Sequence, residues 1–182
     1  MSLSPLLNSP YKPISRHPFD TNLSSDLDWY TGTFVNPAYN TITLCTPTST
    51  TGDCPDVLRA FDRVDAVSPY KTHSNLYASY VGTWSSHLRL TRLPDADEEH
   101  VFLAQFPYLF PYGFGKNTSG FEMMEPGLSE AIMKFVFEES GGKDSERRVV
   151  GIGMYRMAND MNVRQRLGGS IEETADVWWI RA

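Results

Sequence analysis

The sequence predicts a mainly β fold, a small antiparallel β-barrel with one short α-helix. Runs of β-branched and aromatic residues recur along the chain, and polar or Gly- and Pro-rich turns separate them. Aromatic residues make up 13% of the chain, which suits strands that carry rings on an inward face. This spacing of strands and turns fits a meander that closes on itself.

The chain divides into an arm and one larger domain. Residues 1–25 are rich in Pro and Ser and are predicted to form an extended N-terminal arm. Residues 26–182 are predicted to form the β-barrel domain, and the total of 182 residues is enough for one domain with a buried core. The sequence contains no internal repeat.

The domain opens with a predicted hairpin. The runs WYTGTFVN and YNTITLC lie on either side of the turn at residues 36–38. A turn-rich loop, TPTSTTGD, follows them. Residues 55–66 are predicted to form a short amphipathic helix, because the segment starts with proline and has apolar residues at helical spacing, namely Val57, Leu58, Phe61 and Val64.

The rest of the domain is predicted to be mostly strand. The alternating segments are LYASYVGTWSSHLRLTRL, HVFLAQF, LSEAIMKFVFEE and RRVVGIGMYRM, and polar turns separate most of them. In the third segment, the alternation places on one face Ala131, Met133, Phe135 and Phe137. The segment PYLFPYGFGKNTSGFEMMEPG is predicted to be a long aromatic loop, and residues 177–180 are predicted to form a closing strand.

Composition and charge limit the classes of partner. The net charge of −6 argues against nucleic acid and anionic membranes, because either would favour a basic patch. No apolar run approaches the roughly 20 residues of a membrane span, and the N-terminus lacks the features of a signal peptide. We therefore expect a cytoplasmic protein, or a secreted one if the chain was excised from a longer parent. No cofactor or metal is expected, because the four histidines are scattered and CxxC spacing is absent.

Cys45 and Cys54 bracket the turn-rich loop. In an oxidising compartment they could pair, which would stabilise the fold by roughly 2–3 kcal/mol for so short a loop. In a cytosolic protein they would remain two free thiols. Because we expect a cytoplasmic protein, we favour the free thiols.

The tetrapeptide SPYK occurs twice, at Ser9–Lys12 and Ser68–Lys71, and both copies fit the Ser-x-x-Lys spacing of penicillin-recognising enzymes. That chemistry needs the lysine one helical turn away from the serine. The first copy lies in the Pro-rich arm, where Pro13 disfavours a helix, and the second lies in a predicted loop. No Tyr-x-Asn or Lys-Thr-Gly element completes such a site, so we interpret both matches as accidental.

The order of the segments resembles a known family. The hairpin WYTGTFVNPAYNTITLC is similar to the start of the C-terminal, non-catalytic domain that follows the hydrolase domain in β-lactamase-related proteins, especially fungal ones. The matching positions are Tyr30, Gly32, Phe34, Asn36, Pro37, Tyr39 and Thr41. Later segments that resemble the same domain include both cysteines, WSSHLRL, LFPYGFGKNTSGFE, GLSEAIMKFVFE and LGGSIEETADVWW. The resemblance covers about residues 27–182.

This resemblance implies a lipocalin-like antiparallel β-barrel. It also implies that the catalytic serine, lysine and tyrosine belong to a hydrolase domain that this chain lacks. The hydrolytic activity of the family is therefore not expected here. The chain would be either an excised accessory domain or a free-standing barrel.

The first functional hypothesis is a barrel that binds a hydrophobic small molecule. A barrel of about eight strands can hold one small ligand in an apolar interior with a few polar anchors. The alternative for each aromatic residue at strand spacing is a place in the core. The candidate ligand-binding residues are Trp84, Phe102, Phe106, Tyr108, Phe110, Tyr112, Phe114, Met123 and Phe135.

The second hypothesis is a cofactor-independent isomerase or cyclase of the pericyclase-like kind found in fungal secondary metabolism. Such a catalyst holds a flexible substrate in a reactive shape and polarises one carbonyl or phenol. His87 and Arg89 share one face of a predicted strand and are the candidate acid and anion holder. Glu122 is the candidate base. All three residues would also suit a solvent-exposed face.

The third hypothesis is an accessory or oligomerisation domain, which would bind a hydrolase partner or a second copy of the chain through its edge strands or its arm. An enclosed cavity in the barrel would favour the first two hypotheses. An interior filled by side chains would favour the third.

Overall fold

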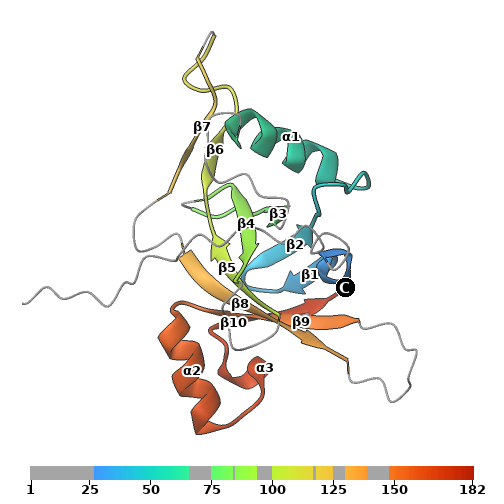
Figure 1. The fold of residues 1–182 in the computed structure, drawn as a ribbon, viewed down its shortest axis with the longest axis vertical. Coiled ribbons are helices and arrows are strands. Elements are labelled where there is room, and N and C mark those ends of the chain that lie inside the picture. Colours follow the sequence, from blue (N-terminus) through green and yellow to red (C-terminus); the bar gives the residue numbers. More distant parts are fainter. Residues whose placement is uncertain are drawn as a thin grey trace, which may run out of the picture.

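The computed structural model describes residues 27–65, 75–83, 85–93, 100–116, 118–124, 130–138 and 148–182. These residues form the predicted antiparallel β-barrel, whose eight strands lie in the order β2-β1-β10-β9-β8-β5-β4-β3 (Figure 1). A second, two-stranded sheet, β6–β7, projects from one end of the molecule beside α1 (Figure 1). The predicted arm over residues 1–25 and both SPYK matches lie outside the described residues.

The secondary structure confirms most of the predicted elements. The barrel strands are β1 (Gly32–Asn36), β2 (Asn40–Leu44), β3 (Asn75–Ser79), β4 (His87–Arg92), β5 (Val101–Gln105), β8 (Glu130–Phe137), β9 (Val149–Tyr155) and β10 (Val177–Arg181). The helices are α1 (Cys54–Asp65), α2 (Ala158–Leu167) and α3 (Ile171–Thr174), and a 3-10 turn spans Leu27–Tyr30. The predicted opening hairpin, the helix over residues 55–66 and the closing strand are therefore confirmed.

The first and last strands are neighbours in the sheet, and its two edge strands meet in a short seam. The last strand returns to the first, with Phe34 opposite Arg181 and Val35 opposite Ile180. On the other side, β2 meets β3 through a single bridge, in which the Cys45 N–H donates to the Tyr77 carbonyl (2.8 Å) and the Tyr77 N–H donates to the Cys45 carbonyl (2.9 Å). The edge strands β2 and β3 of the eight-stranded sheet are thus joined by this one bridge, which leaves the barrel nearly closed.

Buried apolar side chains pack together in the barrel interior at the described positions. The alternation along β8 points Ala131, Met133 and Phe135 inward, as predicted, and all three are buried. The rings contact one another: the centroids of Tyr30 and Phe102 lie 4.9 Å apart, and those of Phe102 and Phe135 lie 5.1 Å apart. The buried inner cluster consists of Leu27, Tyr30, Phe34, Ile42, Leu44, Leu76, Ala78, Leu88, Leu90, Phe102, Ala104, Ala131, Met133, Phe135, Val149, Ile152, Val177 and Trp179.

Helix α1 covers the outer face of β3 and β4. Val57, Phe61 and Val64 have the spacing of one helical face, and all three are buried. They form a separate apolar cluster with Tyr77 from β3 and Leu109 from β6. Helix α1 therefore joins the projecting hairpin to the barrel wall.

The helices near the C-terminus were not predicted. Among the described side chains of α2, only Met161 is a buried apolar residue, so the sequence shows no apolar stripe. Helix α3 begins with a capping box: the Ser170 Oγ accepts from the Glu173 N–H (3.2 Å), and the Glu173 carboxylate accepts from the Ser170 N–H (2.7 Å). The Ser-x-x-Glu pattern in the sequence is the signal that would have located this helix.

The prediction of a long aromatic loop is wrong in part. Within residues 107–127, β6 (Tyr108–Phe110) pairs antiparallel with β7 (Phe121–Met123). The short alternations YLF and FEM each have one inward residue between two outward ones, which is the strand period. The Pro- and Gly-rich residues between these strands form the turns that suggested a loop.

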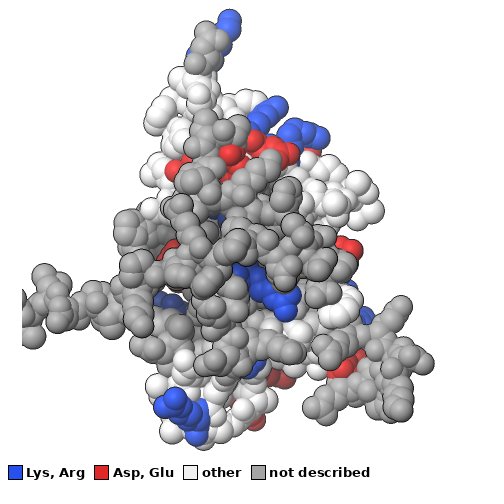
Figure 2. Space-filling view, in the orientation of Figure 1, with Lys and Arg blue, Asp and Glu red and all other residues white. Residues whose placement is uncertain are grey.

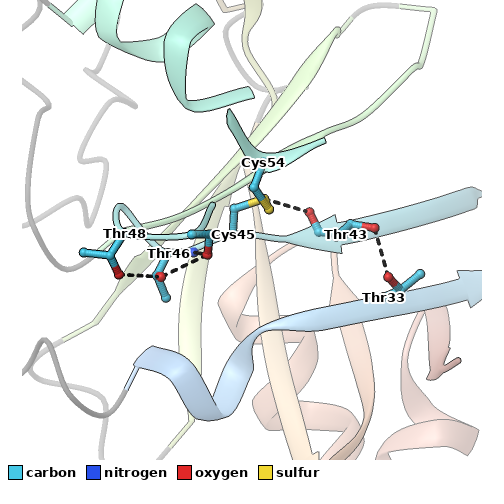
Figure 3. The surroundings of a disulfide bond; sticks show 7 residues. Thr33, Thr43, Cys45, Thr46, Thr48 and Cys54 are labelled. Carbon is cyan, nitrogen blue, oxygen red and sulfur yellow. Dashed lines mark hydrogen bonds between the residues drawn. A yellow bond between two sulfur atoms is a disulfide. The ribbon is translucent and has the colours of Figure 1, made fainter. Parts of the chain in front are cut away.

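The two cysteines form a disulfide, which corrects the expectation of free thiols. Cys45 follows β2 and Cys54 begins α1, and their Cα atoms lie 5.6 Å apart (Figure 3). The bond fixes the start of α1 to the end of β2. A disulfide that closes a loop of this length stabilises the folded state by about 2–3 kcal/mol. Disulfides persist mainly in oxidising compartments. The bond therefore gives no support to the cytoplasmic location from which free thiols were expected, and that location stays a prediction.

Two surface features bear on the kind of environment. No helix in the described part of the chain is long and apolar enough to cross a membrane. Over α1, acidic and basic side chains lie mixed, so this face presents no single sign of charge (Figure 2). Arg59 and Asp56 on this helix form an ion pair, and their side chains are 61% and 79% exposed.

Candidate functional site

A group of large apolar side chains is exposed on the outer face of the β6–β7 hairpin. We call this face the aromatic plate, and it consists of Tyr108, Phe110, Phe114, Phe121 and Met123. Phe114 is 87% exposed, Met123 57% and Tyr108 41%. Because large exposed apolar patches mark interaction sites, the plate is the first candidate for function.

The rings of the plate form a continuous row. Phe110 and Phe121 are opposite each other across the strand pair and stack, with centroids 4.7 Å apart and an interplanar angle of 14°. Phe114 lies at 4.6 Å from Phe121, and Tyr108 lies at 5.0 Å from Phe110. Cross-strand aromatic pairs of this kind stabilise a two-stranded sheet, so the stacked pair supports the hairpin.

The inner face of the hairpin is fixed to the barrel. Leu109 is buried in the α1 cluster, and its N–H donates to the Ser86 Oγ at 2.9 Å. Its cross-strand partner, Glu122, reaches the guanidinium of Arg89 on β4. The hairpin therefore presents one anchored face and one exposed face.

Arg89 is the centre of this anchor. It is fully buried on the outer face of β4, and its Nη2 lies 2.9 Å from Asp65 Oδ1 and 2.9 Å from Glu122 Oε2. The guanidinium carbon also lies 5.1 Å from the centroid of the Phe61 ring. Two carboxylates from α1 and β7 compensate the charge of Arg89, so the cluster fits a structural clamp better than a holder for a substrate anion.

His87 lies two residues before Arg89 on the same outer face. Its Nδ1 is 2.8 Å from the Ser86 Oγ, and its ring meets the Phe61 ring edge-on at 5.3 Å between centroids. Burial lowers the pKa of His87 to about 4, because the charged imidazolium is poorly solvated there. The imidazole is therefore neutral at pH 7. The structure brings the three predicted catalytic residues to one region outside the barrel, where two of them pair with each other.

The lowered pKa of His87 predicts an acid-sensitive contribution to stability. As the pH falls below about 6.5, His87 binds a proton in the unfolded chain, whereas in the folded chain it binds one only near pH 4. The free energy of unfolding should therefore fall by about 1–2 kcal/mol more in the wild type than in His87→Gln between pH 7 and pH 4, since each pKa unit corresponds to about 1.4 kcal/mol and solvent screens part of the effect at this partly exposed ring. Urea titrations of both proteins across this range measure the difference, and parallel pH profiles would contradict it.

Three of the predicted ligand-binding residues belong to the barrel interior or its rim. Phe102 and Phe135 are buried in the inner cluster and contact neighbouring rings. Phe106 is partly buried against the same cluster and meets the Tyr80 ring at 5.1 Å. All three residues therefore occupy packed positions in or beside the core, which was the alternative to a ligand-binding role.

The remaining predicted ligand-binding residues lie outside the barrel or outside the described chain. Four of them, Tyr108, Phe110, Phe114 and Met123, come together on the aromatic plate. Tyr112 lies in the turn after β6, is 69% exposed, and has the Arg63 guanidinium 4.3 Å from its ring centroid. Trp84 is outside the described residues.

Sequence reasoning missed Asp65 and Phe121. Asp65 ends α1, where a carboxylate is normally expected on the solvent side, and no local signal indicates that it faces Arg89. Phe121 lies in the same aromatic segment as its stacking partner, so the pairing of YLF with FEM would have located it.

The described residues contain no group of three or more His, Cys, Asp or Glu side chains that could hold a metal ion. Comparisons of the chain with protein-family models, with curated proteins and with solved structures give no match. The functional assignment therefore depends on the geometry of the chain itself.

Proposed function

We propose that this chain is an assembly domain that associates with a second copy of itself through the aromatic plate. The observation that carries the proposal is the row of contacting rings, of which Tyr108 and Phe114 are exposed, on a hairpin whose other face is anchored by Arg89. Soluble monomers rarely expose contiguous apolar patches of this kind without a function. A rigid plate also loses little conformational entropy on binding.

The size of the plate fits a weak self-association. With aromatic side chains that bury roughly 150–250 Å² each, the plate exposes on the order of 400 Å² of apolar surface. Two plates in contact would bury about 800 Å², and neighbouring residues of the turn, such as the exposed Tyr112, would bring the contact toward the low end of specific interfaces, near about 1,200 Å². We therefore expect a dimer whose population rises with protein concentration.

The charge of the chain also favours this contact over others on the surface. The net charge of −6 makes two copies repel each other, but none of the five plate residues is charged. An isologous contact around a two-fold axis would place the same uncharged face on both sides. Raising the salt concentration should then strengthen the dimer, because it screens the repulsion and leaves the apolar contact intact.

Sedimentation velocity over a range of protein concentrations tests the proposal. The wild type should shift from monomer to dimer as the concentration rises, and the double variant F114S/M123S should bind itself about a hundredfold more weakly, since four buried apolar side chains are lost per dimer. Leu167→Ser on α2 is the matched control, because Leu167 is also an exposed apolar residue, at 81%. This control should dimerise as the wild type does.

Two results would contradict the proposal. One is a wild type that stays monomeric at every concentration. That result would contradict self-association even if the plate bound lipid or another protein. The other is an F114S/M123S variant that dimerises as well as the wild type while circular dichroism shows both to be folded.

The other hypotheses have less support from the geometry. A hydrophobic ligand inside a lipocalin-like barrel would have to displace the contacting rings of Tyr30, Phe102 and Phe135. A cofactor-independent isomerase that used Arg89 would need the guanidinium released from both carboxylates. An accessory role beside a β-lactamase-like hydrolase is compatible with the plate, since the same surface would then contact a different partner.

A further inference from the structure

The seam between β2 and β3 is open on one side of its bridge. The antiparallel register set by Cys45 and Tyr77 places Thr43 opposite Ser79. The bridge between Cys45 and Tyr77 is isolated, so in the described chain the strand pairing does not continue to Thr43 and Ser79. Further along the seam, the Asn40 Nδ2 donates to the Val81 carbonyl at 3.3 Å. Two strand edges thus face each other without pairing.

The hydrogen-bonding groups at this opening point toward each other. Along a strand, successive residues direct their N–H and C=O groups to opposite sides. Because Cys45 and Tyr77 bond across the seam, residues two positions away, Thr43 and Ser79, direct their backbone groups the same way. The opening therefore presents donors and acceptors from both strands that a ligand can use.

A pocket lies over this opening, outside the barrel. Its volume is about 430 Å³, which is within the range of small-molecule sites. The residues that line it are Asn40, Thr41, Thr43, Cys45, Asp53, Val57, Ser79 and Val81. The disulfide holds one wall in place, since it joins the end of β2 to the start of α1 (Figure 3).

The lining combines apolar and polar groups. Val57 and Val81 supply apolar surface, while Thr41, Thr43 and Ser79 supply hydroxyl groups. Thr41 and Thr43 point outward because Ile42 and Leu44 between and beside them point into the barrel. The carboxylate of Asp53 disfavours an anionic ligand and can accept a hydrogen bond from a hydroxyl or amide group.

We propose that this seam pocket binds a small uncharged molecule with a compact apolar body and a hydroxyl or amide group on one edge. The apolar body would lie against the two valines, and its polar edge would bond to the unpaired backbone of Thr43 and Ser79. The pocket is separate from the aromatic plate, so this inference does not depend on self-association.

Binding of 2-naphthol, an aromatic alcohol of this class, tests the proposal in solution. The wild type should bind the probe in ligand-observed NMR and by the change in its fluorescence. Thr43→Trp should fill the pocket and weaken binding by about tenfold or more. Val163→Trp on α2 is the control, because Val163 is 55% exposed and does not line the pocket, and it should bind the probe within about twofold of the wild type.

Three outcomes would overturn the inference. The wild type would not bind 2-naphthol, T43W would bind it as well as V163W does, or the plate variant F114S/M123S would lose the binding. The last outcome would place the probe on the aromatic plate. Thermal unfolding of each variant shows whether T43W remains folded, and Thr43→Leu provides a second, smaller substitution in the pocket if it does not.

Discussion

Replacing Arg89 with methionine should lower the free energy of unfolding by about 3–5 kcal/mol. The substitution keeps an unbranched apolar side chain but leaves the buried carboxylates of Asp65 and Glu122 without their common partner. Uncompensated charge in a buried place is one of the few causes of so large a loss. Urea unfolding followed by circular dichroism measures the effect, and dimerisation should weaken with it, because Glu122 no longer holds the hairpin.

Two variants show whether the loss comes from the buried cluster. Arg59→Met removes an exposed ion pair with Asp56 and should change stability by less than about 0.5 kcal/mol. The triple variant D65L/R89M/E122L replaces all three charges by apolar groups and should recover most of the loss. An R89M protein that is as stable as R59M would contradict the structural role of the Arg89, Asp65 and Glu122 cluster.

Replacing Phe102 with alanine should cost about 3–5 kcal/mol, because it removes a ring from the middle of the barrel. Phe102 is fully buried and packs edge-on against Tyr30 and Phe135, with centroids 4.9 and 5.1 Å away. If these rings instead surrounded a ligand cavity, removing one would enlarge that cavity at little cost in stability. Thermal and urea unfolding of the variant distinguish a packed interior from a hollow one.

Phe102→Leu is the conservative partner of this variant. It keeps most of the apolar volume and should cost less than about 1.5 kcal/mol. Neither variant should change the binding of 2-naphthol at the seam, as long as the protein is folded. A Phe102→Ala protein with wild-type stability would show that the interior is not packed as the structure has it.

The strands could be predicted from the sequence because their signal is local. Alternating apolar residues in the segment around Met133 and Phe135 point to one face in any antiparallel sheet, and the structure buries that face. Helix α2 could not be predicted, since among its described side chains Met161 alone is buried and apolar, and its partners Val101, Ile132 and Tyr155 lie far away in the sequence. The β6–β7 hairpin was obscured because its strands are short and its connection is rich in Gly and Pro.

The site could be predicted only in part, for a physical reason. Arg89 and Glu122 were candidates because of their charged side chains. Their ion pair depends on how the β6–β7 hairpin folds back over β4, and no local sequence pattern predicts that arrangement. The aromatic residues after Pro107 stand out in the sequence because they alternate with prolines and glycines. Whether such rings point inward or outward depends on the pairing of Tyr108 with Met123 and on the side that α1 covers.

Amide chemical shifts measured during dilution of the wild-type protein test the central claim most directly. If the aromatic plate joins two copies, dilution from about 1 mM to about 10 µM should move the amide signals of residues 108–114 and 121–123 and leave those of β8 and β9 unchanged, since weak dimers dissociate over this range. Plate signals that stay constant across the dilution, or shifts that fall elsewhere on the barrel, would contradict the account.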